Sequence, residues 1–314
     1  MKTKSKINCI GILVADALSG PLEHYPERKI RSQAITKTIR FAAGGGAANT
    51  GGALAKMGLD TGVFSKVGDD LTGDFILREL SGCGVEVSGV KVSKGENTPF
   101  TFVGVHPDGD RTFIHTPGTN LTFNVTDIDT EKLFSADYLL YQDCWVLPKL
   151  DGAPAAKLLA KARRRGVVTL LDECWGLGPR LDVLKEMLPH CDYFMPSCDD
   201  MAAILPGLSP GQIADKLLSM GAKNVMLKMG AEGCLLCFDG KKIKSPSMAG
   251  RIVDTTGAGD CWDAGFIAGL ANGLSIEDAA RAGSVAASMC MENVGGCGGI
   301  QSWKKIIEKI GTKK

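Results

Sequence analysis

From about residue 136 onward, the sequence alternates between short apolar runs of strand length and amphipathic runs of helix length. The apolar runs include "ADYLLYQD", "VVTLLDE" and "NVMLKMG", and the amphipathic runs include "APAAKLLAKARRRG" and "SPGQIADKLLSMG". Two neighbouring parallel strands need a crossover connection, which is usually a helix. The alternation therefore predicts an α/β fold in which a mainly parallel sheet is covered by helices on both faces.

The N-terminal part of the chain carries a different pattern. "INCIGILVAD" (Ile7–Asp16) is predicted to be one buried strand that ends in an acid. "QAITKTIRF" and "TPFTFVGVHPDGDRTFIHT" are β-rich, and the second contains the turn residues Pro107, Asp108, Gly109 and Asp110. A turn of this kind between two β-rich runs is typical of a hairpin. We expect these segments to form a small sheet that is separate from the parallel one.

The composition excludes several classes of protein. The 314 residues carry 36 Lys and Arg against 35 Asp and Glu, so the net charge is +1 and nothing suggests a nucleic-acid partner. No segment reaches the length of a membrane span, and the N-terminal apolar run is better explained as a strand than as a signal peptide. The 11 cysteines are odd in number and irregularly spaced, which favours free thiols over disulfides or a zinc site. We therefore expect a cytoplasmic protein that binds neither nucleic acid nor membranes.

Three acids directly follow apolar runs that are predicted to be strands: Asp16, Asp143 and Asp172. Ligands of parallel α/β sheets bind at the carboxyl ends of the strands, so these side chains are candidates for a polar crevice. The alternative is that they cap loops or helices. Trp145 and Trp175 follow two of these acids, and core packing is the simpler interpretation of each. A tryptophan at the rim of a pocket could instead cover the apolar face of a sugar.

The segment "TTGAGD" (Thr255–Asp260) directly precedes a run whose apolar residues have helical spacing. It is either a turn that caps the helix or a backbone shaped to hold an anion. A helix start presents unpaired N–H groups and a partial positive charge, and glycines let a ligand approach the backbone closely. Asp260 would then lie beside an anion site, where it could take a proton from an attacking hydroxyl. The simpler alternative is a surface carboxylate that interacts with the helix dipole.

The sequence contains neither a Walker A loop nor the H-R-D set of the protein kinases. Phosphoryl transfer by this chain would therefore use another scaffold with the same needs. Those needs are a base for the nucleophile, neutralisation of the negative charge on the transferred group, and magnesium.

Two long segments resemble the signatures of one enzyme family. "DTTGAGD" followed by "CWDAGFIAGL" resembles the C-terminal signature of the PfkB (ribokinase-like) carbohydrate kinases, and "FAAGGGAANTGGALAKMGLDTGVFSKVGDDLTGDF" (Phe41–Phe75) resembles their N-terminal signature. The resemblance implies a three-layer α/β/α sandwich and a single kinase domain over residues 1–314, with a small β-sheet lid from about residues 17–40 and 98–116. It also implies a sugar substrate, ATP and Mg²⁺, and a homodimer through the lid, with a monomer as the alternative.

The resemblance also assigns roles to single residues. Asp260 matches the catalytic base, and the backbone of Gly257, Ala258 and Gly259 matches the anion hole that faces the γ-phosphate. The residues expected to line the sugar site are Asp16, Gly44, Gly45, Gly46, Asn49, Asn120 and Asp143. Asn49 could instead be an amide that only caps or fills a helix. His115 has neither a catalytic triad nor a metal site around it and is expected to be structural.

"NVMLKMGAEGC" resembles the nucleotide-binding segment of the family and places two glycines in its G-x-x-G pattern. Lys228 stands where Thr or Ser is common. It could reach an ATP phosphate, or it could be a solvated lysine at the end of a strand. The residues expected to bind the nucleotide are Ser197, Lys228, Gly230, Gly233 and Ser284.

The metal-binding stretch of the family, P-N-x-x-E, reads "MPSCDDMAAIL" here, with Ser197 for the Asn and Asp200 for the Glu. Both keep oxygen ligands suited to a hard cation, so we expect Asp200 to bind Mg²⁺ through water, with Asp199 as the alternative. Many relatives also bind a monovalent cation beside the anion hole. The positions that match such a potassium site are Asp254, Thr256, Asn293 and Gly295.

The sequence thus favours ATP-dependent phosphorylation of a hydroxyl of a small sugar or polyol, with Asp260 as the base. One alternative is a nucleoside kinase, which would need an apolar or aromatic slot for the nucleobase although only 6% of the residues are aromatic. Another is a catalytically silent sugar-binding protein, which the replaced Ser197 and Asp200 suggest and the intact GAGD sequence opposes.

Overall fold

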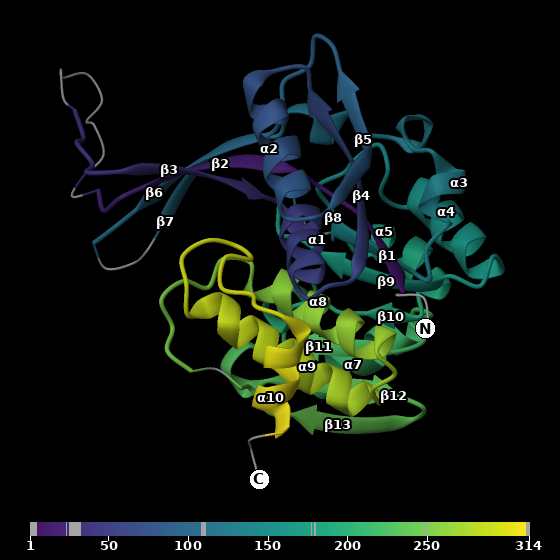
Figure 1. Ribbon diagram of the computed structural model, residues 1–314. Coiled ribbons are helices and arrows are strands. Elements are labelled where there is room, and N and C mark those ends of the chain that lie inside the picture. The colour runs from purple at the N-terminus through teal and green to yellow at the C-terminus, as the bar shows by residue number, and fades with distance from the viewer. Residues whose placement is uncertain are drawn as a thin grey trace.

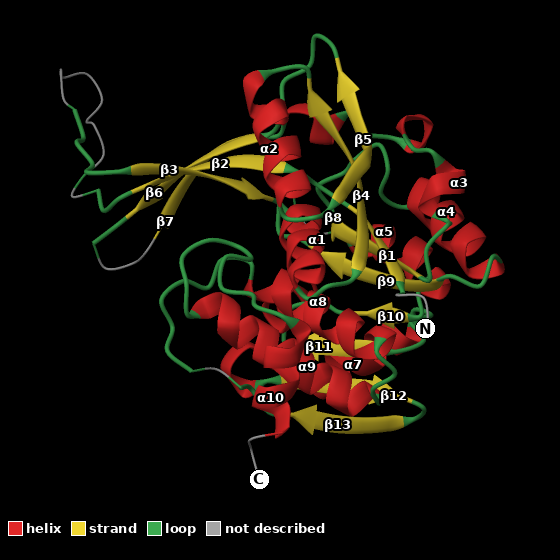
Figure 2. Cartoon of the chain, in the orientation of Figure 1, coloured by secondary structure: helices red, strands yellow, loops and turns green. Residues whose placement is uncertain are grey.

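The computed structural model describes residues 5–22, 24, 33–107, 111–176, 178, 180–248 and 250–311. Helices cover both sides of a large sheet, and a small sheet projects from this body (Figures 1 and 2). The large sheet has nine strands in the order β13-β12-β11-β10-β9-β8-β1-β4-β5. In chain order these strands are β1 (Lys6–Ile10), β4 (Asp60–Gly68), β5 (Glu86–Ser93), β8 (Tyr138–Cys144), β9 (Val168–Glu173), β10 (Tyr193–Phe194), β11 (Val225–Lys228), β12 (Cys234–Phe238) and β13 (Lys241–Ser245).

The large sheet is mainly parallel. All pairs from β5 to β11 are parallel, and only β11–β12 and β12–β13 are antiparallel. The antiparallel part consists of β11, β12 and β13, of which β12 and β13 form a hairpin. The central strands are buried along nearly their whole length, as expected for a sheet with helices on both faces.

Each face of the large sheet has its own hydrophobic core. One core includes Ile7 and Cys9 of β1, and the other includes Ile10 at the end of the same strand. The first core is covered by α1 (Gly46–Lys56), α2 (Leu71–Gly82), α8 (Ala258–Ala271), α9 (Ile276–Met291) and α10 (Trp303–Gly311). The second is covered by α3 (Thr130–Leu133), α4 (Ala153–Arg164), α5 (Leu181–Met187), α6 (Cys198–Ile204) and α7 (Pro210–Ser219). The fold is therefore the predicted three-layer α/β/α sandwich.

The small sheet has four strands in the order β3-β2-β6-β7. They are β2 (Val14–Ser19), β3 (Ile39–Gly44), β6 (Phe100–Val105) and β7 (Arg111–Thr116). The pairs β2–β3 and β6–β7 are antiparallel, and β2–β6 is parallel. The separate sheet predicted from the β-rich segments is present. Residues 23 and 25–32 of the first predicted lid segment, and 108–110 of the predicted turn, lie outside the described residues.

One prediction about the strands is wrong. Ile7–Asp16 does not form a single strand, because the chain leaves the large sheet after Ile10 and enters the small sheet at Val14. The break follows from close packing at Gly11, where a Cβ atom would lie 2.5 Å from Oδ2 of Asp143. An uninterrupted apolar run gives no sign of such a change of sheet, because both halves are buried.

No helix in the described part of the chain is long and apolar enough to cross a membrane. All of the predicted free thiols are free, including Cys234 and Cys237, which are buried.

Candidate active site

The "TTGAGD" segment forms the start of α8. Gly257 is the N-cap with a positive φ of 74°, and a Cβ atom there would lie 2.7 Å from the backbone of Gly296. Ala258 donates its N–H to the carbonyl of Thr255, and the first intrahelical bond of this turn runs from Cys261 to Gly257 (2.9 Å). The amides of Gly259 and Asp260 lie in the first turn, where the helix itself supplies no acceptor. The turn and the anion-binding backbone are therefore one structure.

Asp260 is held in place by side chains from two other elements. The Asn49 amide on α1 donates to Oδ2 at 2.8 Å, and the Gln142 amide on β8 lies 3.4 Å from Oδ1. The Thr50 hydroxyl donates to the Asp260 carbonyl at 3.1 Å. Burial raises the pKa of Asp260, and the hydrogen bond from Asn49 opposes this shift. The result is an oriented carboxylate with a raised pKa, which suits a general base.

Asn49 was expected at the sugar, and in the structure its amide donates to the carboxylate of Asp260, the predicted base. Its position is tight because a Cβ atom on Gly296 would collide with the Asn49 amide. Gln142 was not predicted. Gln142 directly follows the apolar residues of β8, which is a signal in the sequence, but only the next residue, Asp143, was predicted to line the site.

Asp16 lies on β2 of the small sheet, on the same face as Thr101 and His115. These residues are paired across three neighbouring strands, and the Thr101 hydroxyl lies 3.0 Å from Nδ1 of His115. Burial raises the pKa of Asp16 to about 6, although a hydrogen bond with Thr101 opposes the shift. Asp16 is paired with Ala42 on β3, and Gly44 of the same strand lies so close that a Cβ atom there would collide with the Asp16 carboxylate. The glycine loop therefore makes room for this acid, as well as for any ligand.

Asp143 is buried, and both of its carboxylate oxygens accept backbone N–H groups. Oδ2 accepts from Ile12 at 2.9 Å, and Oδ1 accepts from Gly46 at 3.2 Å. Burial and the charge of Asp260 raise the pKa of Asp143. Gly46 is required here because a Cβ atom would lie 2.5 Å from the carboxylate. Asp143 thus fixes the loops around the predicted sugar site.

The remaining candidates for the sugar site lie nearby in different environments. Gly45 has a φ of 90° and packs on the carbonyl of Ile12. Asn120 is buried in a short 3₁₀ turn (Gly118–Leu121) that follows the small sheet. Trp145 is buried in the core and donates its indole N–H to the Arg180 carbonyl, so the core interpretation holds for it. Trp175 is 56% exposed and lines the acidic cavity described below.

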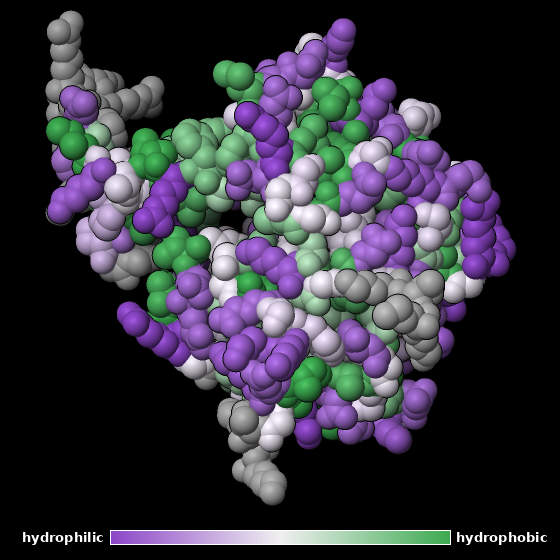
Figure 3. All heavy atoms as spheres, in the orientation of Figure 1, coloured by the Kyte–Doolittle hydropathy of each residue, from purple (hydrophilic) through white to green (hydrophobic). Residues whose placement is uncertain are grey.

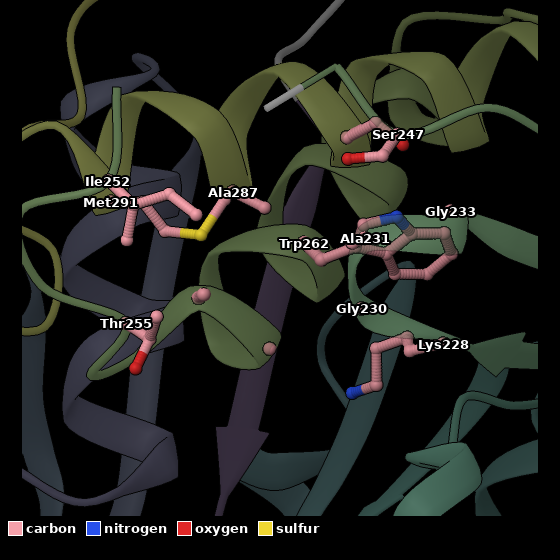
Figure 4. A pocket seen from close by; sticks show the side chains of 13 residues that line it. Lys228, Gly230, Ala231, Gly233, Ser247, Ile252, Thr255, Trp262, Ala287 and Met291 are labelled. Atoms are coloured by element: carbon pink, nitrogen blue, oxygen red, sulfur yellow. The ribbon is translucent and has the colours of Figure 1, made fainter. Parts of the chain in front are cut away.

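An apolar cavity of about 250 Å³ lies between β11, α8 and α9 (Figure 4). Figure 4 shows the Trp262 indole beside Ala231 and Gly233, with Ile252 and Met291 at the opposite side. Four of the predicted nucleotide-binding residues line it: Lys228, Gly230, Gly233 and Ser284. Trp262 and Met291 were not predicted, because apolar side chains at helical spacing do not reveal which of them line a cavity. The walls suit a flat apolar ring system with a polar group at one end.

A second cavity of about 380 Å³ adjoins the first at the start of α8. Its lining includes the carboxylates of Asp172, Glu173, Asp199, Asp200 and Asp260, together with Ser197. Burial and the neighbouring charges of Asp172 and Asp200 raise the pKa of Glu173 to about 9. Oδ1 of Asp172 and Oε2 of Glu173 are buried and have no hydrogen-bond partner in the described part of the chain. Buried acidic groups that lie this close together are stabilised by a cation that balances their charge.

Lys228 connects the two cavities, since it lines both. Its ammonium lies 2.9 Å from Oδ2 of Asp172 and 3.2 Å from Oδ1 of Asp263. Burial alone would lower the pKa of Lys228, but the attraction of these two carboxylates outweighs it and raises the pKa. The alternative of a solvated lysine is therefore wrong. Asp263 was not predicted, although a charged residue in the apolar face of α8 was a visible signal.

The acidic cavity fits a hard divalent cation by its donor chemistry. In the described residues, no three Asp, Glu, His or Cys side chains converge closely enough to hold a metal ion by themselves. Mg²⁺ often keeps several waters and binds through one or two carboxylates and substrate phosphates, which matches this arrangement. Asp200 and Glu173 are the side chains placed to contribute. Ser197 donates its backbone N–H to Oε1 of Glu173 at 2.8 Å.

At the predicted potassium site, the Asp254 carboxylate and the carbonyls of Thr256 and Gly295 already accept protein donors. Asp254 accepts N–H groups from Thr256 (2.7 Å) and Gly295 (3.0 Å), and it pairs with Arg111 of β7. The Thr256 carbonyl accepts the Cys290 thiol at 3.2 Å. The Asn293 amide donates to the Met289 carbonyl, and the Gly295 carbonyl accepts the N–H of Gly298. These residues do not fit a monovalent cation in this structure.

Comparison with known proteins agrees with this geometry. The family model of the pfkB family carbohydrate kinases matches residues 4–303. The chain belongs to the PfkB family of carbohydrate kinases. The family membership and enzyme class predicted from the two signatures are thereby confirmed, and the roles of the single site residues stay predictions.

Relatives of this PfkB-family kinase include enzymes for different acceptors. A ribokinase of Arabidopsis thaliana is 29% identical over 286 residues, which cover 87% of this chain and 73% of the relative. A nucleoside kinase of Methanocaldococcus jannaschii is 25% identical over 312 residues, which cover 97% and 96%. The structure of Arabidopsis thaliana ribokinase complexed with ribose and ATP has a TM-score of 0.85 at 27% identity, with 98% of this chain and 99% of that chain covered.

Proposed function

We propose that this PfkB-family kinase transfers the γ-phosphoryl group of ATP to a hydroxyl of a small sugar or polyol. The placement of Asp260 supports this most. Its carboxylate is oriented by Asn49 and Gln142, lies in the first turn of α8, and lines the acidic cavity that adjoins the apolar one. A protein that only binds sugar has no need of an oriented base at an anion-binding helix start.

The chemistry follows from these groups. Asp260 accepts the proton of the acceptor hydroxyl while the oxygen forms its bond to the γ-phosphorus and the bond to the β-phosphate oxygen breaks, which releases ADP. The backbone at Gly257–Asp260 and the positive end of the α8 dipole stabilise the negative charge of the transferred group. Lys228 reaches the same place from β11, since a Cβ atom on Gly259 would lie 3.6 Å from its ammonium.

The nucleotide base and the metal have separate places in this proposal. The apolar cavity beside Trp262 accepts the adenine, and the phosphates extend past Lys228 to the start of α8. Mg²⁺, when bound with the nucleotide, supplies charge that neutralises the phosphates. Asp200 and Glu173, which line the acidic cavity, would hold it, in part through water.

The acceptor binds between Asp16 and Asp260 in this proposal. Asp16 accepts hydrogen bonds from sugar hydroxyls, and the small sheet acts as a lid that excludes water, which would otherwise take the phosphoryl group. We infer that lid and body work as one kinase unit. The free thiols are compatible with the reducing cytoplasm, which we propose as its location.

A nucleoside acceptor is the second candidate. Phe113 is 61% exposed and lies on the face of the small sheet that carries Thr101 and His115, so it could stack on a nucleobase. The relative from Methanocaldococcus jannaschii is a nucleoside kinase. If this is correct, Phe113→Ala raises KM for a nucleoside and leaves KM for free sugars unchanged.

We also propose that the opposite face of the small sheet forms a homodimer. Ile39, Phe41 and Ile114 share that face and are 54%, 59% and 62% exposed, an apolar cluster that is visible on the projecting sheet in Figure 3. A two-fold axis would bury this face against its copy. Ile114→Glu should convert the dimer into a monomer in light scattering, whereas Arg40→Glu on the other face should not. A wild-type monomer at micromolar concentration contradicts the proposal.

The deciding experiment measures ADP release with a panel of sugars, polyols and nucleosides. The Asp260→Asn variant should bind ADP with unchanged affinity and lose about 10²–10⁴-fold in kcat. Asp74→Asn, which changes an exposed acid in the first turn of α2, is the matched control. Wild-type kcat in the Asp260 variant would show that another group is the base. Saturable sugar binding without turnover in the wild type would support a silent binding protein instead.

A further inference from the structure

Arg111 connects the small sheet to the loop that precedes α8. It is the first residue of β7, and its guanidinium donates to Oδ1 of Asp254 and to the hydroxyl of Thr256. Arg111 is 143 and 145 residues away from Asp254 and Thr256 in the sequence, so the contact forms only when the small sheet lies over the body. The Arg111 side chain is 19% exposed and the Asp254 side chain 3% exposed, which makes this a partly buried ion pair rather than a surface contact.

Asp254 organises the backbone on both sides of the anion-binding site. One carboxylate oxygen accepts the Thr256 N–H directly before Gly257, and the other accepts the Gly295 N–H. Gly296, the next residue, packs on Gly257 and on Asn49. A shift of Asp254 would therefore move the backbone around the start of α8 and the amide that holds Asp260.

A carboxylate in this position needs a positive partner. Burial raises the pKa of Asp254, but the hydrogen bonds from Gly295, Thr256 and Arg111 outweigh burial and lower it, so the group is ionised. The oxygens of Asp254, Thr256 and Gly295 have protein donors, as shown above, and they leave little room for a diffusible cation. The guanidinium of Arg111 supplies the charge from the protein itself.

We propose that Arg111 is a positioning residue that serves as the fixed cation of the catalytic loop, in place of a monovalent metal ion, and couples closure of the small sheet to the alignment of Gly257–Asp260. This inference rests on the proposed function. It assigns Arg111 no direct contact with the reacting atoms. A guanidinium suits the role because its fork can bind a carboxylate and a hydroxyl at once, whereas lysine offers a point charge.

The first test compares Arg111→Gln and Arg111→Lys with Arg40→Gln, an exposed arginine on the same face of the small sheet. Arg111→Gln should lose about 10²-fold in kcat because the loop is displaced, with little change in the KM for ATP. Added guanidinium at non-denaturing concentration should restore part of the kcat of Arg111→Gln, and Arg111→Lys should retain more activity than Arg111→Gln. Arg40→Gln should behave as wild type. Unchanged kcat in Arg111→Gln would overturn the proposal.

The second test exchanges sodium for potassium in the assay buffer. The wild type should show the same kcat in both salts, because Arg111 carries the charge. A wild type that is active only with potassium would overturn the fixed-cation role.

The third test needs no turnover and separates this inference from the proposed function. Hydrogen exchange of the amides of residues 254–260 and 295–296 should be faster in Arg111→Gln than in the wild type, and unchanged in Arg40→Gln. If no acceptor gives turnover, the proposed function fails while faster exchange still supports the link. Identical exchange in all three proteins would overturn the link, whatever the activity.

Discussion

The two cavities that meet at the first turn of α8 have walls of opposite chemistry. The cavity beside Trp262 and Met291 is lined by apolar and small residues, with Lys228 as its charged group. The adjoining cavity carries five carboxylates around the same lysine. One end of a nucleotide is a flat apolar ring and the other is a polyanion that needs cations. In the proposed function, this difference between the cavities would orient the nucleotide before any single contact is considered.

The contrast also shows how a binding site can be built from groups that destabilise the fold. Glu173, Asp200 and Asp260, which line the acidic cavity, all have pKa values raised by burial, so their charged forms are disfavoured in the folded protein. The apolar cavity contains no such cluster in the described part of the chain. The destabilising burial of acidic groups is thus concentrated in the acidic cavity, where we propose that the phosphoryl group is transferred.

Among the variants that test the difference between the two cavities, Lys228→Met is expected to have the largest effect. The variant removes the ammonium shared by both cavities and leaves Asp172 and Asp263 as unpaired buried acids, so unfolding free energy should fall by about 3–5 kcal/mol. ATP affinity should fall as well. Urea unfolding measures the change in stability, and titration with ADP measures the change in nucleotide affinity.

Lys228→Met combined with Asp263→Asn serves as the control. Removing one of the unpaired charges should recover part of the stability without recovering ADP affinity. Equal recovery of both would show that the lysine only supports the fold.

A smaller effect is expected from Asp16→Asn. Its folded-state pKa of about 6 lies above the unfolded value of 3.8, so the folded protein binds this proton more tightly and stability falls as pH rises from 4 to 6. The amide avoids this loss, and unfolding free energy at pH 7 should rise by about 1–3 kcal/mol. Acceptor affinity should fall by about 10–100-fold, because a hydrogen bond to a charged group is lost.

The pH profile of the wild type tests the same residue. KM for the acceptor should rise as pH falls through about 6, because Asp16 becomes protonated and loses acceptor capacity. The KM profile of Asp16→Asn should be flat over this range. A profile that keeps its inflection in the variant would assign the titration to another group.

The smallest effect is expected from Ala287→Leu in α9, at the wall of the apolar cavity. The larger side chain should narrow the place of the adenine and raise KM for ATP about tenfold, which corresponds to about 1.4 kcal/mol. KM for the acceptor should stay unchanged. If the acceptor KM rises instead, the apolar cavity is the acceptor site and the orientation of the two ligands is reversed.

The sequence predicted the parts of this molecule that depend on local patterns. The alternation of strands and helices predicted the layers, and the order of glycines, Asp260 and the apolar run predicted the helix start at Gly257. That this helix start holds an anion stays a prediction. The change of sheet after Ile10 was missed, because a buried run looks the same whether or not it stays in one sheet.

The missed contacts share a physical cause. Lys228–Asp263, Arg111–Asp254 and Gln142–Asp260 join residues from different elements, and their spacing in the sequence carries no information about the angles at which those elements meet. A charged residue within an apolar helix face, such as Asp263, was one of the few signals available. It indicates that a partner exists, but it does not identify the partner.

The two backbone bonds of Asp143 have a mechanical consequence. Ile12 lies where the chain passes from β1 to the small sheet, and Gly46 lies where the chain returns from β3 to α1. Both crossings are pinned to one carboxylate in the body, so a swing of the small sheet has a fixed pivot there. Asp143 adjoins Gln142, which contacts the carboxylate of Asp260, the proposed base. Asp143, which anchors the small sheet, and Gln142, which contacts Asp260, are thus neighbours on a single strand, β8.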